Sequence, residues 1–240
     1  PGEQGAQAIC EILFGDVCPS GKLPITIPRN IGQLPIFYSM KPSGRGYGYV
    51  ENDGSPLYPF GYGLSYTSFS AKSEASFSGR TVTVDTHVTN IGEYSGKYVF
   101  QIYLECPCGK LGKPRRILTG FQKTDLLLPS QSQDLTLNFY LDDFASFDDS
   151  GITGHPNSYL LEPGTYRSAA GADVRSAETI FCFDLPELVV TQVLTEYAAV
   201  YPGTAFNRIV NRNGNFSLEQ VPVAQKDLID RALFTAYLVS

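Results

Sequence analysis

The chain has no tryptophan, a single methionine (Met40) and only two histidines, His87 and His155, among 240 residues. Without tryptophan, the Cys…Trp…Cys hallmark of antibody-type domains is missing. A role as a sugar-binding module is also weakened, because such surfaces favour large flat rings for stacking. The two histidines lie far from each other and from any cysteine pair, so the sequence indicates no histidine-based zinc site.

Cysteines are few, odd in number and without a framework spacing, which argues against a disulfide scaffold in a chain of this size. They are Cys10, Cys18, Cys106, Cys108 and Cys182. The Cys106-Pro107-Cys108 pair is too tight for the usual zinc spacing, and no histidine follows at the right distance. We therefore expect no metal site, and the cysteine content is compatible with a reducing compartment.

Positive charge is scarce: 18 Lys and Arg stand against 24 Asp and Glu, which gives a net charge of −6. A duplex-binding protein needs a basic face to displace counterions from phosphates. The one basic cluster, residues 110–116, is interrupted by glycine and proline and indicates a solvated loop. No run approaches the roughly 18 apolar residues of a membrane-spanning helix. We expect neither nucleic acid nor a membrane as a partner.

The N-terminal region has the elements of an incomplete unit. Residues 4–14 predict a helix with one apolar face, because their apolar side chains recur at helical spacing. Residues 23–28 predict a short strand whose prolines exclude a central position in a sheet. One helix and one edge-like strand cannot form a domain, so we expect the end of an α/β layer whose other strands lie upstream. The chain starts at Pro1, and we interpret it as a piece of a longer protein in which a signal peptide cannot be assessed.

Residues 29–67 are rich in glycine, proline and tyrosine, with aromatic clusters at residues 44–49 and 58–67. The glycines of the first cluster follow neither the spacing nor the context of a phosphate loop. Glycines between aromatic residues let the backbone turn sharply while the rings pack on neighbouring surfaces. Two interpretations stay open. The segment forms either an aromatic sugar platform, with Tyr47 and Tyr49 as substrate-binding candidates, or a packed crossover between two domains.

From about Phe69 onward, apolar and polar residues alternate, which indicates β-strands. Short strands separated by turn residues over about 115 positions are typical of an antiparallel sandwich of immunoglobulin size. The predicted strands cover residues 81–88, 98–104, 117–121, 135–140, 164–169 and 178–183. We expect the sandwich to occupy residues 68–184 and the unit before it to end at residue 67.

After residue 184 the period changes again. Residues 188–199 and 222–237 predict helices, the second with a proline tolerated in its first turn. Residues 207–219 between them predict a polar connector. Residues 185–240 are too few to enclose a core of their own, so we expect this tail to dock on another part of the protein.

No group of side chains in the sequence combines into a catalytic site. The acidic cluster at residues 142–149 has no apolar pocket or histidine nearby that would raise the pKa of one carboxyl. A solvated turn is the favoured interpretation, with a weak calcium site as the alternative. His87 is expected to be a paired strand residue, and His155 lies in a loop. No Gly-x-Ser-x-Gly motif occurs. We assign no catalytic, cofactor-binding or metal-binding residue to this chain.

Several long segments in a fixed order resemble one enzyme family. Pro-Gly-Glu-Gln-Gly-Ala-Gln-Ala-Ile at residues 1–9 and Leu-Phe-Gly-Asp-Val-Cys-Pro-Ser-Gly-Lys-Leu-Pro at residues 13–24 strongly resemble glycoside hydrolase family three. Residues 56–67 look like that family's junction into its fibronectin type III-like domain. Further matches fall at residues 88–92, 113–114, 118–123 and 163–166, so the resemblance covers about residues 1–184. Two mild departures are Ala6, where the family has a second glycine, and Cys18, where it often has asparagine.

The resemblance implies a fold: an α/β edge fragment, then an all-β immunoglobulin or fibronectin type III-like sandwich, then a short helical C-terminal connector. It also implies retaining hydrolysis of a terminal β-linked sugar, as in a β-glucosidase, without a cofactor. The family's nucleophilic aspartate lies in a (β/α)8 barrel, and its acid/base is usually a glutamate upstream of residue 1. Neither motif is present here, so the resemblance gives this stretch a structural role.

Residues 221–231 resemble the connector of family members with reversed domain order, which would place the missing barrel after residue 240. The rival interpretation is a non-catalytic β-sandwich for carbohydrate binding or adhesion. It explains the alternating region equally well, but it does not explain the severed α/β edge. Sugar specificity, oligomeric state and location are not assigned, beyond a default expectation of the bacterial cytoplasm.

Overall fold

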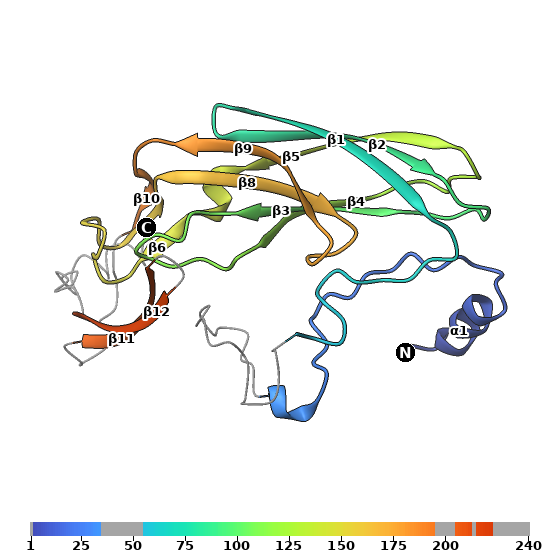
Figure 1. The fold of residues 1–240 in the computed structure, drawn as a ribbon, viewed down its shortest axis with the longest axis horizontal. Coiled ribbons are helices and arrows are strands. Elements are labelled where there is room, and N and C mark those ends of the chain that lie inside the picture. Colours follow the sequence, from blue (N-terminus) through green and yellow to red (C-terminus); the bar gives the residue numbers. More distant parts are fainter. Residues whose placement is uncertain (1, 35–54, 195–204, 213–214, 223–240) are drawn as a thin grey trace, which may run out of the picture.

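A computed structural model describes residues 2–34, 55–194, 205–212 and 215–222. Its body is a sandwich of two antiparallel sheets with strand orders β1-β2-β5 and β4-β3-β8-β9, in the upper half of Figure 1. The strands are β1 (Phe69–Ser78), β2 (Thr81–Asn90), β3 (Val99–Glu105), β4 (Ile117–Lys123), β5 (Ser132–Tyr140), β8 (Gly164–Gly171) and β9 (Glu178–Leu185). The predicted fibronectin type III-like sandwich is confirmed, and every strand predicted for it corresponds to one of these.

The inner faces of the two sheets pack into one apolar core. Val82, Val84 and Val88 of β2 have no exposed surface, whereas Asp85 and His87 on the opposite phase are exposed. This alternation arises because successive side chains of a strand point to opposite faces. Burying an aliphatic side chain of this size stabilises the fold by about 1.5–3 kcal/mol. The core residues are Val82, Val84, Val88, Phe100, Ile102, Leu104, Leu127, Leu135, Phe139, Leu141, Leu161, Tyr166, Phe183 and Leu185.

A tight turn and a tyrosine hydrogen bond fix the path of the backbone around this core. Gly79 and Arg80 both have positive φ, as the tight turn between β1 and β2 requires for strands that keep their natural twist. At the start of β8, the Tyr166 hydroxyl donates to the carbonyl oxygen of Glu162 at 2.8 Å. This is the tyrosine corner of immunoglobulin-like sandwiches, which fixes the entry into a central strand.

A small third sheet covers one end of the sandwich, with order β10-β7-β6. Its strands are β6 (Ser146–Asp148), which follows the 3₁₀ turn η2 (Leu141–Phe144), then β7 (Ser158–Leu161) and β10 (Val189–Val193). The helix predicted over residues 188–199 was wrong for Val189–Val193. The chain leaves β9 and pairs at once with β7, and this pairing outweighs the helical spacing of the apolar residues.

The tail also differs from the prediction. β11 (Ala205–Arg212) and β12 (Asn215–Pro222) form a two-stranded antiparallel hairpin, not a polar connector. Pro222 ends β12, where its missing N–H is tolerated at a strand terminus. The rest of the helix predicted over residues 222–237 lies outside the described residues.

The N-terminal part runs below the sandwich in Figure 1. Helix α1 (Gly5–Leu13) confirms the predicted helix, and no residue of it is buried. A 3₁₀ turn, η1 (Ile31–Gln33), follows. Residues 23–28 bend at Pro24 and Ile25 and form a single bridge, Ile27 to Tyr58, in place of the predicted short strand, because their prolines interrupt the ladder. None of the helices in the described ranges has the length and apolar character needed to cross a membrane.

Candidate functional site

Residues 55–67, here called the junction segment, lie between the N-terminal part and the sandwich. On one side, the Gly61 N–H donates to the Leu23 carbonyl at 2.9 Å, and the Ile27 N–H donates to the Tyr58 carbonyl at 2.9 Å. On the other side, the Phe60 carbonyl accepts from the Val174 N–H at 3.1 Å. The junction segment is therefore hydrogen-bonded to both parts of the chain at the same few residues.

A second, smaller core lies under the junction segment. Tyr103 and Ala169 point outward from β3 and β8, yet they are almost fully buried. Phe60 of the junction segment packs against them. This explains why residues on both faces of β3 are buried. A strand with one solvated face would alternate instead.

Gln101 of β3 links the junction segment to the sheet. Its amide nitrogen donates to the carbonyl oxygens of Gly61 at 3.1 Å and Ala172 at 2.5 Å. Its amide oxygen accepts from the Tyr103 hydroxyl at 2.7 Å. Both amide protons and the amide oxygen therefore have partners, as a buried amide requires. The sequence placed Gln101 in a strand, but nothing in the alternation marked it as an interdomain contact.

Gly61 itself has φ +80, a conformation that side chains with a Cβ rarely adopt. A Cβ at this position would lie 2.3 Å from the Gln101 Oε1 and 2.6 Å from the Tyr103 hydroxyl oxygen. The glycine in the Phe-Gly-Tyr-Gly motif is therefore required both for backbone conformation and for close approach to the sheet.

The turn between β8 and β9, residues 172–177, closes over the junction segment. The Asp173 carboxylate accepts from the Arg175 N–H at 2.8 Å and so shapes the turn. The Arg175 guanidinium donates to the Pro56 carbonyl at 3.2 Å. The Arg116 guanidinium donates to the Val174 carbonyl oxygen at 2.6 Å. Residues far apart in the sequence thus hold residues 56–61 against the sheet.

Burial shifts the pKa values of the ionisable side chains at this interface. Burial raises the pKa of Tyr103 and of Tyr98, and the negative charge of Asp173 acts in the same direction. Burial lowers the pKa of Lys22, and Asp173 partly offsets that change. The raised pKa of Tyr103 favours the protonated hydroxyl, which donates to the Gln101 Oε1 at 2.7 Å.

The two interpretations of the aromatic region can be compared for residues 58–67. The Tyr58 and Tyr62 rings stack at 5.0 Å, and Phe60 packs in the second core. These contacts are those of a packed crossover. Tyr47 and Tyr49 lie outside the described residues, so their role in binding substrate stays a prediction.

The acidic cluster at residues 142–149 is not a solvated turn throughout. Asp148 is fully buried. Its carboxylate accepts from the Thr153 hydroxyl at 2.6 Å, the Thr153 N–H at 2.9 Å and the Ser150 N–H at 3.2 Å. Burial alone would raise the pKa of Asp148, but these hydrogen bonds hold it below its usual value. The solvated interpretation is thus wrong for Asp148, which shapes the loop after β6. In the part of the chain that the structure describes, no three His, Cys, Asp or Glu side chains are close enough to hold a metal ion.

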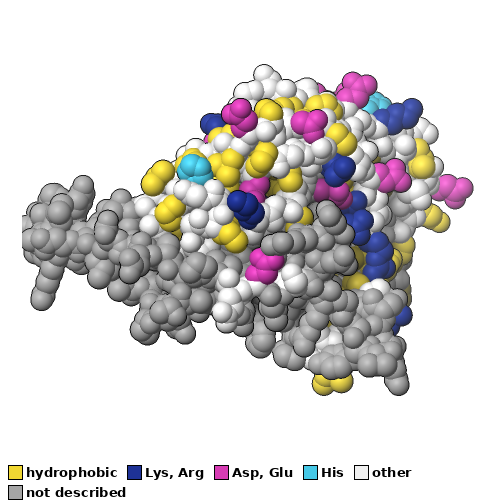
Figure 2. Space-filling view, turned by 60° about the vertical axis from the view of Figure 1, so that its left-hand side comes forward, with side chains coloured by type: hydrophobic (Ala, Val, Ile, Leu, Met, Phe, Trp, Pro, Cys, Tyr) yellow, Lys and Arg dark blue, Asp and Glu magenta, His cyan; other side chains and the backbone are white. Residues whose placement is uncertain are grey.

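The basic cluster at residues 110–116 is likewise more than a solvated loop. The Glu162 carboxylate accepts from the backbone N–H groups of Lys110 at 2.6 Å and Leu111 at 3.2 Å. The Lys113 ammonium donates to the Phe144 carbonyl. Burial lowers the pKa of Lys113. The loop is therefore tied to the turns on either side of the small sheet. Figure 2 shows basic and acidic side chains interspersed on the face it presents.

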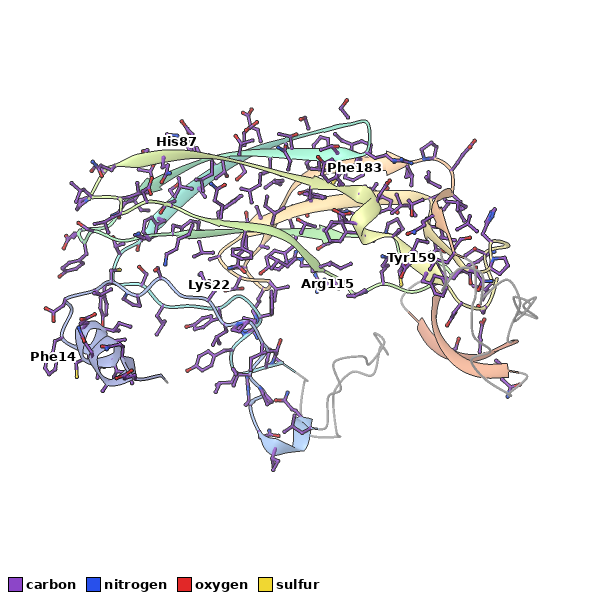
Figure 3. All side chains as sticks on the ribbon, turned by 180° about the vertical axis from the view of Figure 1, so that it is seen from behind. Phe14, Lys22, His87, Arg115, Tyr159 and Phe183 are labelled. Atoms are coloured by element: carbon purple, nitrogen blue, oxygen red, sulfur yellow. The ribbon has the colours of Figure 1, made fainter. Side chains whose placement is uncertain are left out.

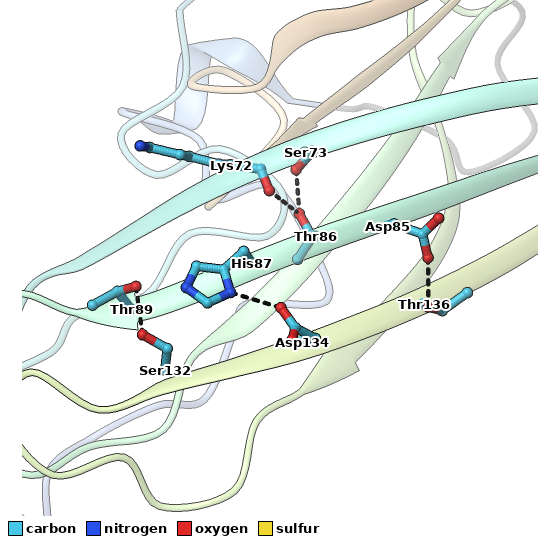
Figure 4. A network of polar contacts seen from close by, with 9 residues as sticks. All are labelled: Lys72, Ser73, Asp85, Thr86, His87, Thr89, Ser132, Asp134 and Thr136. Carbon is cyan, nitrogen blue, oxygen red and sulfur yellow. Dashed lines mark hydrogen bonds and ion pairs between the residues drawn. The ribbon is translucent and has the colours of Figure 1, made fainter.

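A polar groove of about 470 Å³ lies along the outer face of β1, β2 and β5. As expected, His87 is paired in its strand: its Nδ1 lies 2.6 Å from the Asp134 Oδ1 (Figure 4). The Thr136 hydroxyl donates to Asp85 at 2.5 Å, and the hydroxyls of Thr89 and Ser132 pair at 2.8 Å. Three side-chain pairs thus link β2 to β5 across this face.

Comparison with known proteins gives two family matches in chain order. Residues 1–66 match the Glycosyl hydrolase family 3 C-terminal domain, and residues 98–174 match a Fibronectin type III-like domain. A β-glucosidase of Ruminococcus albus is 38% identical over 243 aligned residues, covering 97% of this chain and 25% of that protein. A periplasmic β-glucosidase of Salmonella typhimurium is 36% identical, covering 72% of this chain and 24% of that protein.

Among solved structures, a β-glucosidase from Paenibacillus barengoltzii superposes with a TM-score of 0.79 at 35% identity. The match covers 98% of this chain and 28% of that chain. The chain thus spans about a quarter of the length of these relatives.

Proposed function

Because the chain belongs to glycoside hydrolase family 3, we propose that it is the interdomain joint of a retaining β-glycosidase that hydrolyses terminal β-linked sugars. One observation carries the proposal. Two domains of the family match in order on one chain, and the junction segment packs between them through Gln101 and the second core. The catalytic carboxylates lie in other parts of the full-length protein.

Two acidic side chains of the described residues, Asp148 and Asp173, have structural roles that are compatible with this proposal. Retaining hydrolysis needs two carboxyls about 5–5.5 Å apart, one as nucleophile and one as acid and then base. The buried Asp148 carboxylate is fully committed to Ser150 and Thr153. The Asp173 carboxylate is committed to its own turn. Neither is free to attack a sugar or to protonate a leaving group.

The surface of the N-terminal part supports a larger neighbour. Helix α1 has no buried residue, and Ile9, Leu13 and Phe14 are 52%, 73% and 82% exposed. In Figure 3, Phe14 projects from α1 on the side away from the sandwich. An amphipathic helix needs a partner for its apolar face. In the full-length enzyme, the rest of the α/β domain covers this face.

The proposed division places the α/β end and junction at residues 1–67, the sandwich at residues 68–184 and the connector at residues 185–240. The matches to the Ruminococcus albus and Paenibacillus barengoltzii enzymes cover 97% and 98% of this chain, so they extend into the connector. Together with the likeness of residues 221–231 to a domain connector, this supports a barrel that follows residue 240.

The test is to sequence and express the complete coding region. The full-length protein is expected to release phenol from aryl β-glucosides or β-xylosides, with retained configuration at the anomeric carbon by NMR. The 240-residue chain alone is expected to be inactive under the same conditions. Turnover by the short chain would overturn the assignment of the carboxylates. An inactive full-length protein without a barrel would leave the non-catalytic sandwich module.

Tyr47 and Tyr49 are proposed to edge the aglycone side of the pocket, on the strength of the aromatic density around them. In the full-length enzyme, Tyr47→Ala and Tyr49→Ala are then expected to raise KM for aryl glycosides. Lowered stability with unchanged kinetics would refute this role.

A further inference from the structure

The small third sheet carries two exposed aromatic rings on its outer face. Phe147 of β6 and Tyr159 of β7 are register partners, and their ring centroids lie 5.2 Å apart. They are 36% and 37% exposed. Gln192 of β10 is the register partner of Tyr159 on the other side, and it is also exposed. We call these three side chains the outer row. In a chain without tryptophan, tyrosine and phenylalanine supply the ring surface on which a sugar stacks.

A β-bulge in β10 places Gln192 in the outer row. The register of β10 on β7 shifts between Val190 and Gln192, so Thr191 is the extra residue and Gln192 lies opposite Tyr159. The Thr191 hydroxyl donates to the Tyr159 carbonyl at 3.1 Å. Without the bulge, Thr191 would stand where Gln192 does. Bulges that re-aim a side chain in this way are frequent next to active sites.

The loop that joins β6 to β7, residues 149–157, begins and ends beside the two rings. It is longer than the roughly two to five residues of most hairpin loops, and long ordered loops are usually functional. The buried Asp148 carboxylate fixes its conformation through Ser150 and Thr153. The Asn157 N–H closes it by donating to the Asp148 carbonyl at 2.9 Å. The backbone that carries the rings is thus held in one conformation, which lowers the entropic cost of binding.

The composition of the outer row fits a neutral ligand with apolar faces and polar edges, because it offers two rings and an amide but no charged group. The amide of Gln192 both donates and accepts hydrogen bonds, as sugar hydroxyls require. Three neighbouring strands make the row about 10 Å wide, which accommodates one or two sugar rings. Figure 3 shows Tyr159 at the opposite end of the molecule from Phe14 of α1.

We propose that the outer row is a carbohydrate-binding site that holds internal sugar units of a β-linked polysaccharide. The inference rests on the proposed function, which supplies the class of sugar chain. The rings pack against the apolar faces of the sugars, and Gln192 bonds their hydroxyls.

The test is native electrophoresis of the full-length protein in gels that contain hydroxyethylcellulose or soluble xylan. Such polymers have few chain ends, so retardation reports on binding to internal sugar units. Tyr159→Ala is expected to raise the dissociation constant for the retarding polymer at least about fivefold. The matched control is Tyr140→Ala at the end of β5, because Tyr140 is 61% exposed and lies outside the outer row. This control is expected to be retarded like the parent.

Three results would overturn the proposal: no retardation of the parent by either polymer, equal retardation of Tyr159→Ala and the parent, or equal loss in Tyr140→Ala. Circular dichroism melting checks the fold of each variant. If Tyr159→Ala is unstable, Gln192→Ala replaces it, and unchanged retardation of that variant refutes the site.

Hydrolysis of aryl β-glycosides by the unsubstituted protein is assayed separately. An active enzyme whose retardation does not depend on Tyr159 refutes the outer row alone. An inactive protein whose retardation does depend on Tyr159 refutes the proposed function alone.

Discussion

Replacing Gly61 with alanine is the sharpest perturbation of the joint between the two parts of the chain. Gly61 has φ +80, and its missing side chain is where the Gln101 amide oxygen and the Tyr103 hydroxyl lie. The added methyl group would displace Gln101 from the Gly61 carbonyl, to which it donates at 3.1 Å. The change therefore acts on backbone conformation and on a buried hydrogen-bond network at once.

The magnitude follows from these two contributions. Placing a Cβ in the left-handed region costs about 1 kcal/mol. Leaving buried amide and hydroxyl groups without partners costs about 2–3 kcal/mol more. We therefore expect Gly61→Ala to lower the free energy needed to separate the junction segment from the sheet by about 3–4 kcal/mol. The equilibrium constant for this opening then rises by a factor on the order of 100 to 1,000.

Amide hydrogen exchange at Val174 reports on this opening, because its N–H donates to the Phe60 carbonyl across the joint. The matched control is Gly112→Ala. Gly112 has φ +70, and a Cβ there meets nothing within 4 Å, so only the backbone contribution applies. Exchange at Val174 is expected to accelerate about 100-fold or more in Gly61→Ala and to change little in Gly112→Ala. Equal exchange in the two variants would refute the steric and hydrogen-bonding argument.

Three other changes test the remaining buried polar groups. Asp148→Asn is expected to lower the free energy of unfolding by about 2–3 kcal/mol at neutral pH, because the substituted amide has one acceptor oxygen and cannot accept from both Thr153 and Ser150. The pKa of Asp148 is lowered by folding from 3.8, so its contribution is present above about pH 4 and is lost as the pH falls through the folded value. The variant should therefore lose less stability than the parent in acid denaturation followed by circular dichroism. Tyr166→Phe removes the bond to the Glu162 carbonyl and is expected to cost about 1–2 kcal/mol in urea unfolding, with an unchanged m-value. Asn90→Ala leaves the two loop carbonyls that it bonds without their donor and is expected to cost at least about 2 kcal/mol, whereas an unchanged midpoint would show that the loops hold without it.

The sandwich was predictable from the sequence because its strands bury one face each. Alternation over residues 81–88 matches β2, where Val82, Val84 and Val88 are inside. The short strands β6 and β7 were missed because three or four residues are too few for a period to emerge. The helical spacing after residue 187 was misleading, since β10 is held by pairing with β7 and not by an apolar stripe.

The joint itself was only partly predictable. Glycines between aromatic residues left a packed crossover and a sugar platform as alternatives, and Phe60 and Gly61 occupy a packed crossover. The structural roles of three polar side chains could not be recognised from the sequence, because they depend on how the sheets and loops meet. The partners of Gln101, Asp148 and Glu162 lie 40, 5 and 52 residues away, respectively. Polar residues in strands or turns look solvated unless the covering segment is known.

The turn at residues 172–177, which holds the junction segment through Arg175, is synthesised long after that segment. The contact between Arg175 and Pro56 spans 119 residues, so residues 56–61 leave the ribosome long before the turn that holds them. At bacterial or eukaryotic elongation rates the interval is on the order of 10 s. During that time Phe60 lacks part of the sheet against which it packs in the folded protein. A chain stalled before residue 172 would lack β9 as well as the turn that holds residues 56–61, so the four-stranded sheet itself would be incomplete.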